Sequence, residues 1–421
     1  MRYDEVLNRL TSTGFFSKSA GLSRMETILA HFGNPEESLK VIHVAGTNGK
    51  GSVCAMLHGI LTEAGYKTGL YTSPYIHDFR ERIQINGEMI PKRKLSAIAE
   101  DVFSFTDTLP ERPNQFELIT VIALLYFSRE KCDFVVLETG LGGTFDATNV
   151  VKKPVLTVIM NIGLDHCEVL GNTLTEIAGA KAGILKPGCN AVFYPSGKEA
   201  LTVLTKRADE IGAPYIIPDL SELSELKPVS GFEHFKYKGH SYKLNLLGKH
   251  QMRNATVAVE AAGILKKKGI KIPADAVKSA LAKISWPVRM ELVHRSPDVY
   301  IDGGHNPQCI AAVEEFFRDP RFAGRNVHIL TGMLGDKDYR TMTGILKKFS
   351  EDVYFFRFPH KRAIPEEKMT DFLAEFRLNS TDNPEETLRR LCNSVPKNDI
   401  ILCVGSLYMT DRLRTFFFRH S

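Results

Sequence analysis

A glycine-rich loop between a predicted strand and a predicted helix constrains the fold of this 421-residue chain most strongly. Residues 41–44 form an apolar run, and the sequence GTNGKGS follows at residues 46–52. Apolar residues then recur at helical spacing over residues 53–64, and Gly65 stands where a helix end favours a left-handed residue. In such a strand–loop–helix unit, N–H groups of the loop and the helix N-terminus hold phosphate oxygens.

Two side chains of this loop suit a nucleotide. Lys50 can reach the terminal phosphates, and Ser52 can offer its hydroxyl to Mg²⁺. The spacing departs from the usual G-x-x-x-x-G-K-S/T pattern, because the loop is shorter and Gly51 separates the lysine from the serine. A plain glycine turn is the alternative, but the lysine, the hydroxyl and both flanking elements favour phosphate binding. The predicted nucleotide-binding residues of the loop are Asn48, Gly49, Lys50, Gly51 and Ser52.

Composition indicates a globular protein that acts on small molecules. Hydrophobic residues make up 43% of the chain and charged residues 24%, and no apolar run approaches the ~18 residues that span a membrane. The polar start lacks the apolar core of a signal peptide, and the seven cysteines are scattered, as in reduced cytosolic proteins. The net charge of +5 includes no dense basic block. We therefore expect a cytoplasmic monomer with no nucleic-acid or membrane partner.

Strand-like runs alternate with helical patterns along the chain, which predicts an α/β fold with a mostly parallel sheet. The N-terminal runs lie at residues 41–44, 68–71, 134–137 and 155–160, and a second series near residue 297 onward has runs at 299–301, 327–330, 353–356 and 400–404. Because the length exceeds one ordinary core, we predict two domains, residues 1–295 and 296–421. Short alternating strands predict a β-rich segment at about 214–247, and residues 286–297 are the best linker candidate.

Polar residues follow the predicted N-terminal strands at their carboxyl ends, where open α/β sheets bind ligands. Ser73, Glu138 and His166 supply a hydroxyl, a carboxylate and an imidazole, a set that suits Mg²⁺ bridged to nucleotide phosphates. Each residue alone has a structural explanation, as a turn serine, a solvated charge or a core histidine. Their convergence at one sheet edge favours the metal site.

A lysine lies on the apolar face of another predicted helix. Thr173 and Glu176 form a capping-box pattern, and the helix is predicted to end at Pro187 and Gly188. Lys181 falls in the middle of its apolar stripe, where burial would favour the neutral amine and lower the pKa. The alternative is a lysine whose stem packs while its head reaches water. A neutral amine could react with CO₂ to form a carbamate, which is a carboxylate-like metal ligand.

Together these motifs and several others resemble a known family, folylpolyglutamate synthase/dihydrofolate synthase of the Mur ligase superfamily. The resemblance covers nearly the whole chain, and the combination of motifs is highly specific. The motifs are GTNGKGS at 46–52, TSP at 72–74, FRERI at 79–83, ETGLGG at 138–143, DATN at 146–149, GLDH at 163–166, KAGI at 181–184, HQ at 250–251, NA at 254–255 and DGGHNP at 302–307.

The resemblance implies an ATP-binding P-loop N-terminal domain with a mostly parallel sheet, a smaller Rossmann-like C-terminal domain, and an active site in the cleft between them. It implies ATP-dependent ligation of L-glutamate to a folate or to dihydropteroate through an acyl phosphate, with two Mg²⁺ ions. Ser52, Ser73, Glu138 and His166 would hold the metal, and Lys181 would be carbamylated. The implied nucleotide contacts are Asn254, Arg289, Asp302 and His305, with His305 also stabilising the intermediate. The implied folate site comprises Phe116, Glu117, Phe145, Asp146 and Ala147.

Departures from the family pattern affect substrate preference more than the reaction. Tyr75 and Thr144 stand where the family commonly has histidine and arginine, and Val288 and Gly304 replace glycine and alanine. One alternative is a Mur ligase that extends a UDP-linked peptidoglycan precursor, but the 45 residues before the loop are too few for its separate UDP-binding domain. A nucleotide-controlled switch without ligation is another, and it would need neither a buried lysine nor a second-domain pair of Asp302 and His305.

Overall fold

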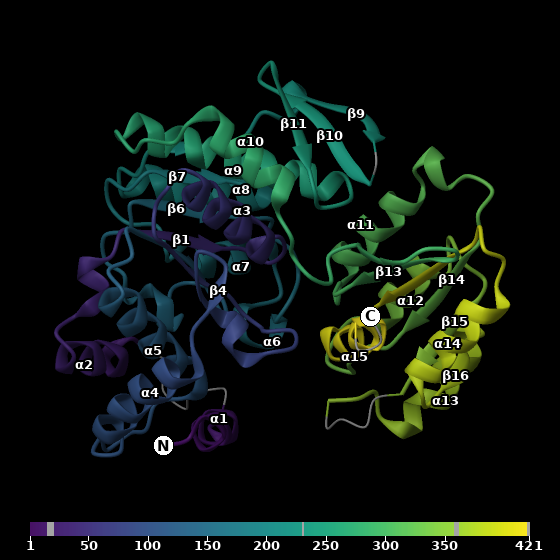
Figure 1. Cartoon of the computed structure of the whole chain (residues 1–421), viewed down its shortest axis with the longest axis horizontal. Helices are drawn as coiled ribbons and strands as arrows, with labels where there is room; N and C mark the ends of the chain where they lie inside the picture. Colours follow the sequence, from purple (N-terminus) through teal and green to yellow (C-terminus); the bar gives the residue numbers. More distant parts are fainter. Residues whose placement is uncertain (15–20, 230, 358–361, 419–421) are drawn as a thin grey trace. The chain divides into compact units, whose positions relative to one another are not determined.

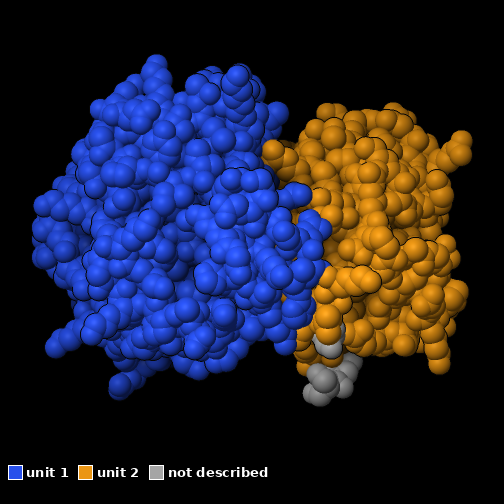
Figure 2. All heavy atoms as spheres, turned by 90° about the horizontal axis from the view of Figure 1, so that it is seen from above, with its two compact units in different colours: residues 1–226, 234–243, 253–284 blue, residues 227–233, 244–252, 285–421 orange. Residues whose placement is uncertain are grey.

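The computed structural model describes residues 1–14, 21–229, 231–357 and 362–418, and its chain divides into two compact units (Figure 2). The first unit comprises Met1–Leu226, His234–Lys243 and Arg253–Ile284. The second comprises Lys227–Glu233, Leu244–Met252 and Ser285–Ser421. The second unit therefore includes two short segments that lie upstream of the predicted boundary at residue 296.

An eight-stranded sheet in the order β4-β3-β2-β5-β1-β6-β7-β8 forms the centre of the first unit (Figure 1). The six strands from β2 to β8 in this order are parallel, whereas β3 and β4 add an antiparallel edge. This arrangement confirms the predicted mostly parallel sheet. The strands are β1 (Val41–Ala45), β2 (Thr68–Tyr71), β3 (Ile83–Ile85), β4 (Glu88–Met89), β5 (Phe134–Glu138), β6 (Leu156–Ile159), β7 (Ala191–Phe193) and β8 (Tyr215–Ile216).

Helices cover both faces of this sheet. On one face, apolar side chains of the sheet pack against α1, α2, α4 and α5, and farther along against α7 and α8. Helix α3 covers β1, β2 and β5 on the other face and packs against α10. The helices are α1 (Tyr3–Ser12), α2 (Ser23–His31), α3 (Lys50–Glu63), α4 (Lys92–Thr106), α5 (Gln115–Arg129), α6 (Cys167–Leu170), α7 (Leu174–Ala182), α8 (Lys198–Glu210), α9 (Lys249–Lys267) and α10 (Ala274–Lys283).

A six-stranded sheet in the order β12-β13-β17-β14-β15-β16 forms the second unit, and all neighbours except β12 and β13 are parallel. Helices α11, α12 and α13 share one apolar cluster with the sheet, and α14 packs against α15. The elements are β12 (Glu291–His294), β13 (Asp298–Asp302), α11 (Pro307–Phe317), β14 (Val327–Thr331), α12 (Tyr339–Leu346), β15 (Val353–Phe356), α13 (Glu366–Phe376), β16 (Asn379–Thr381), α14 (Pro384–Ser394), β17 (Ile400–Val404) and α15 (Leu407–Phe418).

A separate three-stranded sheet lies where the sequence predicts short alternating strands. It consists of β9 (Leu223–Val229), β10 (Phe232–Tyr237) and β11 (His240–Leu244) in the order β11-β10-β9. No helix in the described part of the chain is long and apolar enough to cross a membrane.

Two local predictions are wrong. Helix α7 begins after the predicted capping box of Thr173 and Glu176, but it ends at Ala182 and not at Gly188. A side chain at Gly183 would lie 2.1 Å from the Thr144 hydroxyl, so this position packs against another loop as the helix ends. The predicted linker at residues 286–297 contains strand β12, which pairs with β13 and is part of the second sheet.

A buried ion pair joins α2 to α5 in the first unit. Arg24 donates from Nε and Nη2 to the two carboxylate oxygens of Glu117, at 3.0 and 2.8 Å. Both side chains are less than a tenth exposed. Glu117 also accepts a hydrogen bond from the N–H of Asn114 and so caps α5. The pair therefore fixes the start of α5, the helix that carries Phe116.

We expect Arg24→Met to destabilise the protein by about 3–5 kcal/mol, because it leaves the Glu117 carboxylate buried without its cation. Urea unfolding followed by far-UV circular dichroism measures this loss. Arg129→Met is the matched control, because Arg129 lies at the end of α5 and pairs with Asp101 where both side chains are about half exposed. Loss of that exposed pair should cost less than about 1 kcal/mol. Equal effects of the two substitutions would contradict the structural role of the buried pair.

Candidate nucleotide and metal site

The glycine-rich loop leaves the buried strand β1 and enters α3, whose first residue is Lys50. Gly46 (φ +151°) and Gly49 (φ +85°) have backbone conformations that favour glycine. A Cβ at Gly46 would lie 2.5 Å from Cβ of Met160, and a Cβ at Gly49 would lie 2.9 Å from Oδ1 of Asn254. The loop is thus packed between the end of β6 and α9, and Asn254 lies beside it.

Backbone hydrogen bonds fasten the loop to the segment that follows β6. The N–H groups of Thr47 and Asn48 donate to the carbonyl of Asn161, at 2.8 and 3.3 Å. The Thr47 hydroxyl donates to the carbonyl of Gly163 and accepts from its N–H, both at 3.1 Å. These contacts bring the ends of the adjacent strands β1 and β6 together, so the loop is held in place before any ligand binds.

Two lysines converge on one carbonyl oxygen of the loop. Lys50 Nζ donates to the carbonyl of Gly46 at 3.0 Å and to that of Thr47 at 3.3 Å. Lys181 Nζ, from α7, also donates to the carbonyl of Gly46 at 3.0 Å. Lys181 is only 4% exposed, and burial, reinforced by the charge of Lys50, lowers its pKa to about 7. The burial expected from the sequence is therefore present.

The packing of the loop after β5 fixes the position of Lys181. Thr144 N–H donates to the carbonyl of Ala180 at 2.9 Å. A Cβ at Gly143 would lie 2.8 Å from that same carbonyl oxygen and 2.9 Å from the carbonyl oxygen of Lys181. Only a residue without a side chain lets the two segments come this close. Gly143 of the ETGLGG motif thus lets the loop after β5 pack closely against the end of α7.

Side-chain oxygens that could bind a metal lie at the carboxyl ends of β2 and β5. The N–H of Ser73 donates to Glu138 Oε2 at 3.1 Å, and Lys50 Nζ lies 4.0 Å from Glu138 Oε1. Glu138 and Ser52 are 3% and 2% exposed. Among the described residues, no three His, Cys, Asp or Glu side chains form a metal cage. The donor set still fits Mg²⁺, which usually binds one or two carboxylates together with substrate phosphates and water.

His166 lies on the loop after β6, at the N-terminus of the short helix α6, and its φ of +53° is left-handed. Its side chain is 46% exposed, and Nε2 lies 4.0 Å from the carboxylate of Asp165. The Asp165 side chain is only 7% exposed, and its negative charge acts to raise the pKa of Lys181. The site list drawn from the sequence missed Asp165, although it stands inside the GLDH motif next to His166.

The five predicted folate contacts differ greatly in exposure. Phe145 is 68% exposed, whereas Phe116 and Ala147 are buried. The Phe116 ring packs on Gly140, where an added Cβ would lie 2.5 Å from the ring. Glu117 is bound by Arg24, as described above. Of the predicted set, Phe145 offers the most apolar surface to a ligand.

Asp146 is a buried structural anchor in this state of the protein. It accepts hydrogen bonds from the N–H groups of Leu141 and Thr148 and from the Thr148 hydroxyl. Burial raises the pKa of the Asp146 carboxyl, although these hydrogen bonds oppose the change. The Thr148 hydroxyl lies 2.8 Å from His43 Nε2 on β1, and burial lowers the pKa of His43 to about 3. This network holds the loop after β5 against the strand that precedes the phosphate loop.

The predicted residues of the second unit cluster at the end of β13. Asp302 is fully buried, where desolvation raises the pKa of its carboxyl, and it accepts from the N–H groups of Met290 and Gly304 at 2.9 and 2.7 Å. A Cβ at Gly303 would lie 2.7 Å from Nη1 of Arg289. His305 Nδ1 lies 3.0 Å from the carbonyl oxygen of Gly303. The structure therefore gathers the predicted guanidinium, carboxylate and imidazole around one glycine.

Ser406 is a further candidate site residue beside the Asp302 cluster, and it was not predicted from the sequence. Strand β17 pairs with β13 in parallel register, with Val404 opposite Asp302. Ser406 follows two residues later, is 3% exposed and accepts from the N–H of Tyr408 at 3.2 Å. The sequence could have indicated Ser406, because Gly405 and Ser406 directly follow the apolar run at residues 400–404, at the carboxyl end of a predicted strand.

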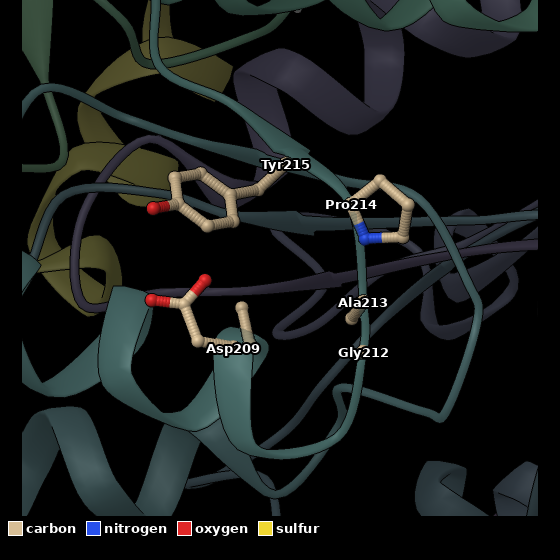
Figure 3. Close-up of a pocket in the computed structure, with 6 residues that line it drawn as sticks. Asp209, Gly212, Ala213, Pro214 and Tyr215 are labelled. Carbon is tan, nitrogen blue, oxygen red and sulfur yellow. The ribbon is translucent and has the colours of Figure 1, made fainter.

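A surface hollow elsewhere in the first unit contains none of the predicted phosphate-binding or metal-binding residues. It lies between the end of α8 and the start of β8, and Figure 3 shows the Asp209 carboxylate facing the Tyr215 ring across it. Because β8 is parallel to its neighbours and the hollow lies at its amino end, this site is at the sheet edge opposite the phosphate loop. The hollow is lined by Ala208, Asp209, Gly212, Ala213, Pro214 and Tyr215.

The Lys181 pKa makes stability depend on pH in a defined direction. Between the folded pKa of about 7 and the ordinary lysine value of 10.5, the unfolded chain binds more protons at this site. The unfolding free energy of the wild type, relative to Lys181→Met, should therefore rise with pH by about 1.4 kcal/mol per unit across this window.

Urea unfolding of both proteins at pH 7.5, 8.5 and 9.5, in buffer free of CO₂, measures the difference. The comparison with Lys181→Met removes the contributions of all other titrating groups. A difference that stays constant over these pH values would show that Lys181 keeps an ordinary pKa.

Two domain families match the sequence. The Mur ligase middle domain matches residues 44–262, and the Mur ligase glutamate ligase domain matches residues 288–407. The chain is 37% identical to the dihydrofolate synthase/folylpolyglutamate synthase of Bacillus subtilis over 411 residues, which cover 95% of each chain. It is 32% identical to the folylpolyglutamate synthase of Lacticaseibacillus casei over 431 residues, which cover 98% of each chain.

Solved structures show the same fold. The apo form of the Lacticaseibacillus casei folylpolyglutamate synthase superimposes with a TM-score of 0.86 at 29% identity, over 99% of this chain and 100% of that one. A folylpolyglutamate synthase in complex with AMPPCP and folate gives the same TM-score at 31% identity, over 98% of this chain and 99% of that one. The α/β fold predicted from the sequence is confirmed.

Proposed function

The chain belongs to the folylpolyglutamate synthase/dihydrofolate synthase family of Mur ligases, and we propose that it joins L-glutamate to a folate, and to dihydropteroate, at the expense of ATP. The observation that carries this proposal is the phosphate loop, where Lys50 and the buried carboxylate of Glu138 stand at adjacent strand ends. The relatives reported above are folylpolyglutamate and dihydrofolate synthases, and they give the peptidoglycan alternative no support.

The reaction forms an amide through an acyl phosphate. The γ-phosphoryl group of ATP passes to a carboxylate of the acceptor, and the amino group of glutamate then attacks the activated carbonyl carbon and displaces phosphate. Phosphoryl transfer depends mainly on positioning and on neutralising charge. The N–H groups at the start of α3 and the ammonium group of Lys50 would supply both, and Lys50 is held beside the loop by the carbonyls of Gly46 and Thr47.

The remaining roles are those that the family resemblance implies. Ser52, Ser73, Glu138 and His166 would hold Mg²⁺, which neutralises phosphate charge when bound. Asn254, Arg289 and Asp302 are assigned to the nucleotide, and His305 to the oxyanion of the tetrahedral intermediate. Phe116, Glu117, Phe145, Asp146 and Ala147 are assigned to the folate site, with Phe145 as the exposed contact and the buried residues as its support.

Lys181 is proposed to react with CO₂ and become a carbamate. The structure supports this modification through the burial of the amine and its lowered pKa, since only the neutral amine reacts with CO₂. A carbamate would add negative charge beside the metal ligands. It would also end the competition of two cations for the carbonyl of Gly46.

Coupled product formation tests the proposed ligation. ADP release should require both L-glutamate and an acceptor, and mass spectrometry should show an acceptor heavier by one glutamyl residue. A reduced folate and dihydropteroate, offered separately, reveal which acceptors are used. ADP formed equally fast without glutamate would indicate a nucleotide switch and contradict the proposal.

Lys50→Ala tests the phosphate-binding role of the loop. The variant should stay folded while turnover falls by more than about 100-fold, because the transferring phosphoryl group loses its cation.

Substitutions at Lys181 test the proposed carbamate. Lys181→Ala should be nearly inactive, and small added carboxylates should restore part of the rate by filling the vacated space. Lys181→Arg should be inactive as well, because a guanidinium stays cationic and cannot take up CO₂. Steady-state turnover measured with and without acetate makes the comparison. Full activity of Lys181→Arg would assign this residue a purely structural role.

A further inference from the structure

The turn that carries Arg289 has an unfavourable backbone conformation. Val288 (φ +52°) and Met290 (φ +45°) both lie in the left-handed region, and both are fully buried. This region is disfavoured for residues with a Cβ and is rarest for β-branched residues such as valine. Such a conformation persists only where the surrounding contacts impose it.

Hydrogen bonds impose the conformation on both sides of Arg289. The N–H of Val288 donates to Glu291 Oε2 at 2.9 Å, and the N–H of Met290 donates to Asp302 Oδ2 at 2.9 Å. The carbonyl of Val288 accepts from the N–H of Gly303 at 2.8 Å. Asp302 was predicted to contact the nucleotide, but Glu291 has no role assigned so far.

Glu291 is held in turn by the last helix of the chain. Arg414 on α15 donates from Nε to both carboxylate oxygens of Glu291, at 3.1 and 2.8 Å. The two side chains are 27% and 22% exposed, so this pair is partly shielded from water. Helix α15 packs against β12 and β13, the two strands that follow the turn in the sequence. The carboxylate of Glu291 thus links α15 to the N–H of Val288.

We propose that Glu291 is a positioning residue for Arg289 and that Arg414 orients Glu291. The inference rests on the nucleotide role assigned to Arg289 under the proposed function. Glu291 acts through the backbone: by holding Val288 in its left-handed conformation it directs the Arg289 side chain across Gly303. There Arg289 Nη1 donates to the carbonyl of Val288 at 3.0 Å.

Glu291→Ala removes the acceptor that holds Val288, so it should raise KM for ATP by about tenfold and change kcat less. Glu291→Gln keeps an oxygen that can accept from Val288, and its effect should be smaller. Adding Val288→Gly to Glu291→Ala should restore KM, because glycine adopts a positive φ without steric cost. A residue that only stabilised the fold would not be rescued in this way.

A matched pair of arginines on α15 provides the control. Arg414→Met removes the partner of Glu291, and Arg412→Met removes an arginine that pairs with Glu385 through two hydrogen bonds of 2.8 Å. Arg414→Met should raise KM for ATP several-fold, whereas Arg412→Met should leave it unchanged. Arg414→Met leaves the Glu291 side chain present but without the arginine that orients it, so it provides a second test if Glu291→Ala fails to fold.

Arg289→Ala separates the failure of this inference from the failure of the proposed function. If Arg289→Ala raises KM for ATP but Glu291→Ala does not, the positioning role is overturned and the role of Arg289 stands. If both variants keep the wild-type KM, the assignment of Arg289 to the nucleotide is overturned as well. A raised KM in Glu291→Ala that Val288→Gly does not restore would also contradict the inference.

Discussion

The carbonyl oxygen of Gly46 accepts hydrogen bonds from Lys50 and Lys181, each at 3.0 Å, and so joins the end of β1 to α3 and α7. Two ammonium groups that share one acceptor repel each other, and the more buried one loses its proton more readily. Burial and the charge of Lys50 accordingly lower the pKa of Lys181 to about 7. The lowered pKa makes the neutral amine of Lys181 accessible near neutral pH.

Close backbone approaches make this convergence possible. Gly46 packs on Met160, and Gly143 packs on the carbonyls of α7, where any side chain would collide. The second unit also has a closely packed loop, in which the carboxylate of Asp302 accepts hydrogen bonds from two backbone N–H groups beside Gly303. In both units a glycine allows a close approach beside a basic side chain, Gly143 beside the helix of Lys181 and Gly303 beside Arg289.

The sequence predicts those parts of the structure that depend on local patterns. The apolar runs at 353–356 and 400–404 coincide with β15 and β17, and the capping box at Thr173 marks the start of α7. The phosphate loop was recognisable because its residues are contiguous. The burial of Lys181 followed from its place on an apolar stripe.

Features that depend on distant partners were not predictable. Arg24 lies 93 positions before Glu117, so nothing local indicates that this carboxylate is already paired. Helix α7 ends where Gly183 packs against Thr144, a residue that is remote in sequence. The residues of β12 were predicted to form a linker because they show no clear strand pattern in the sequence. They form a strand by pairing with β13. Asp165 could be identified as a candidate site residue only from the structure, which shows that its side chain is buried and that its charge acts on Lys181.

The chemical state of Lys181 is measured directly by ¹³C NMR with labelled bicarbonate. Active protein supplied with Mg²⁺ and a nucleotide should show one carbamate carbonyl signal that is absent from Lys181→Arg. The signal should grow as the pH rises through about 7, because the amine then becomes neutral. A fully active wild-type protein without a carbamate signal would contradict the account and leave Lys181 as a structural hydrogen-bond donor to Gly46.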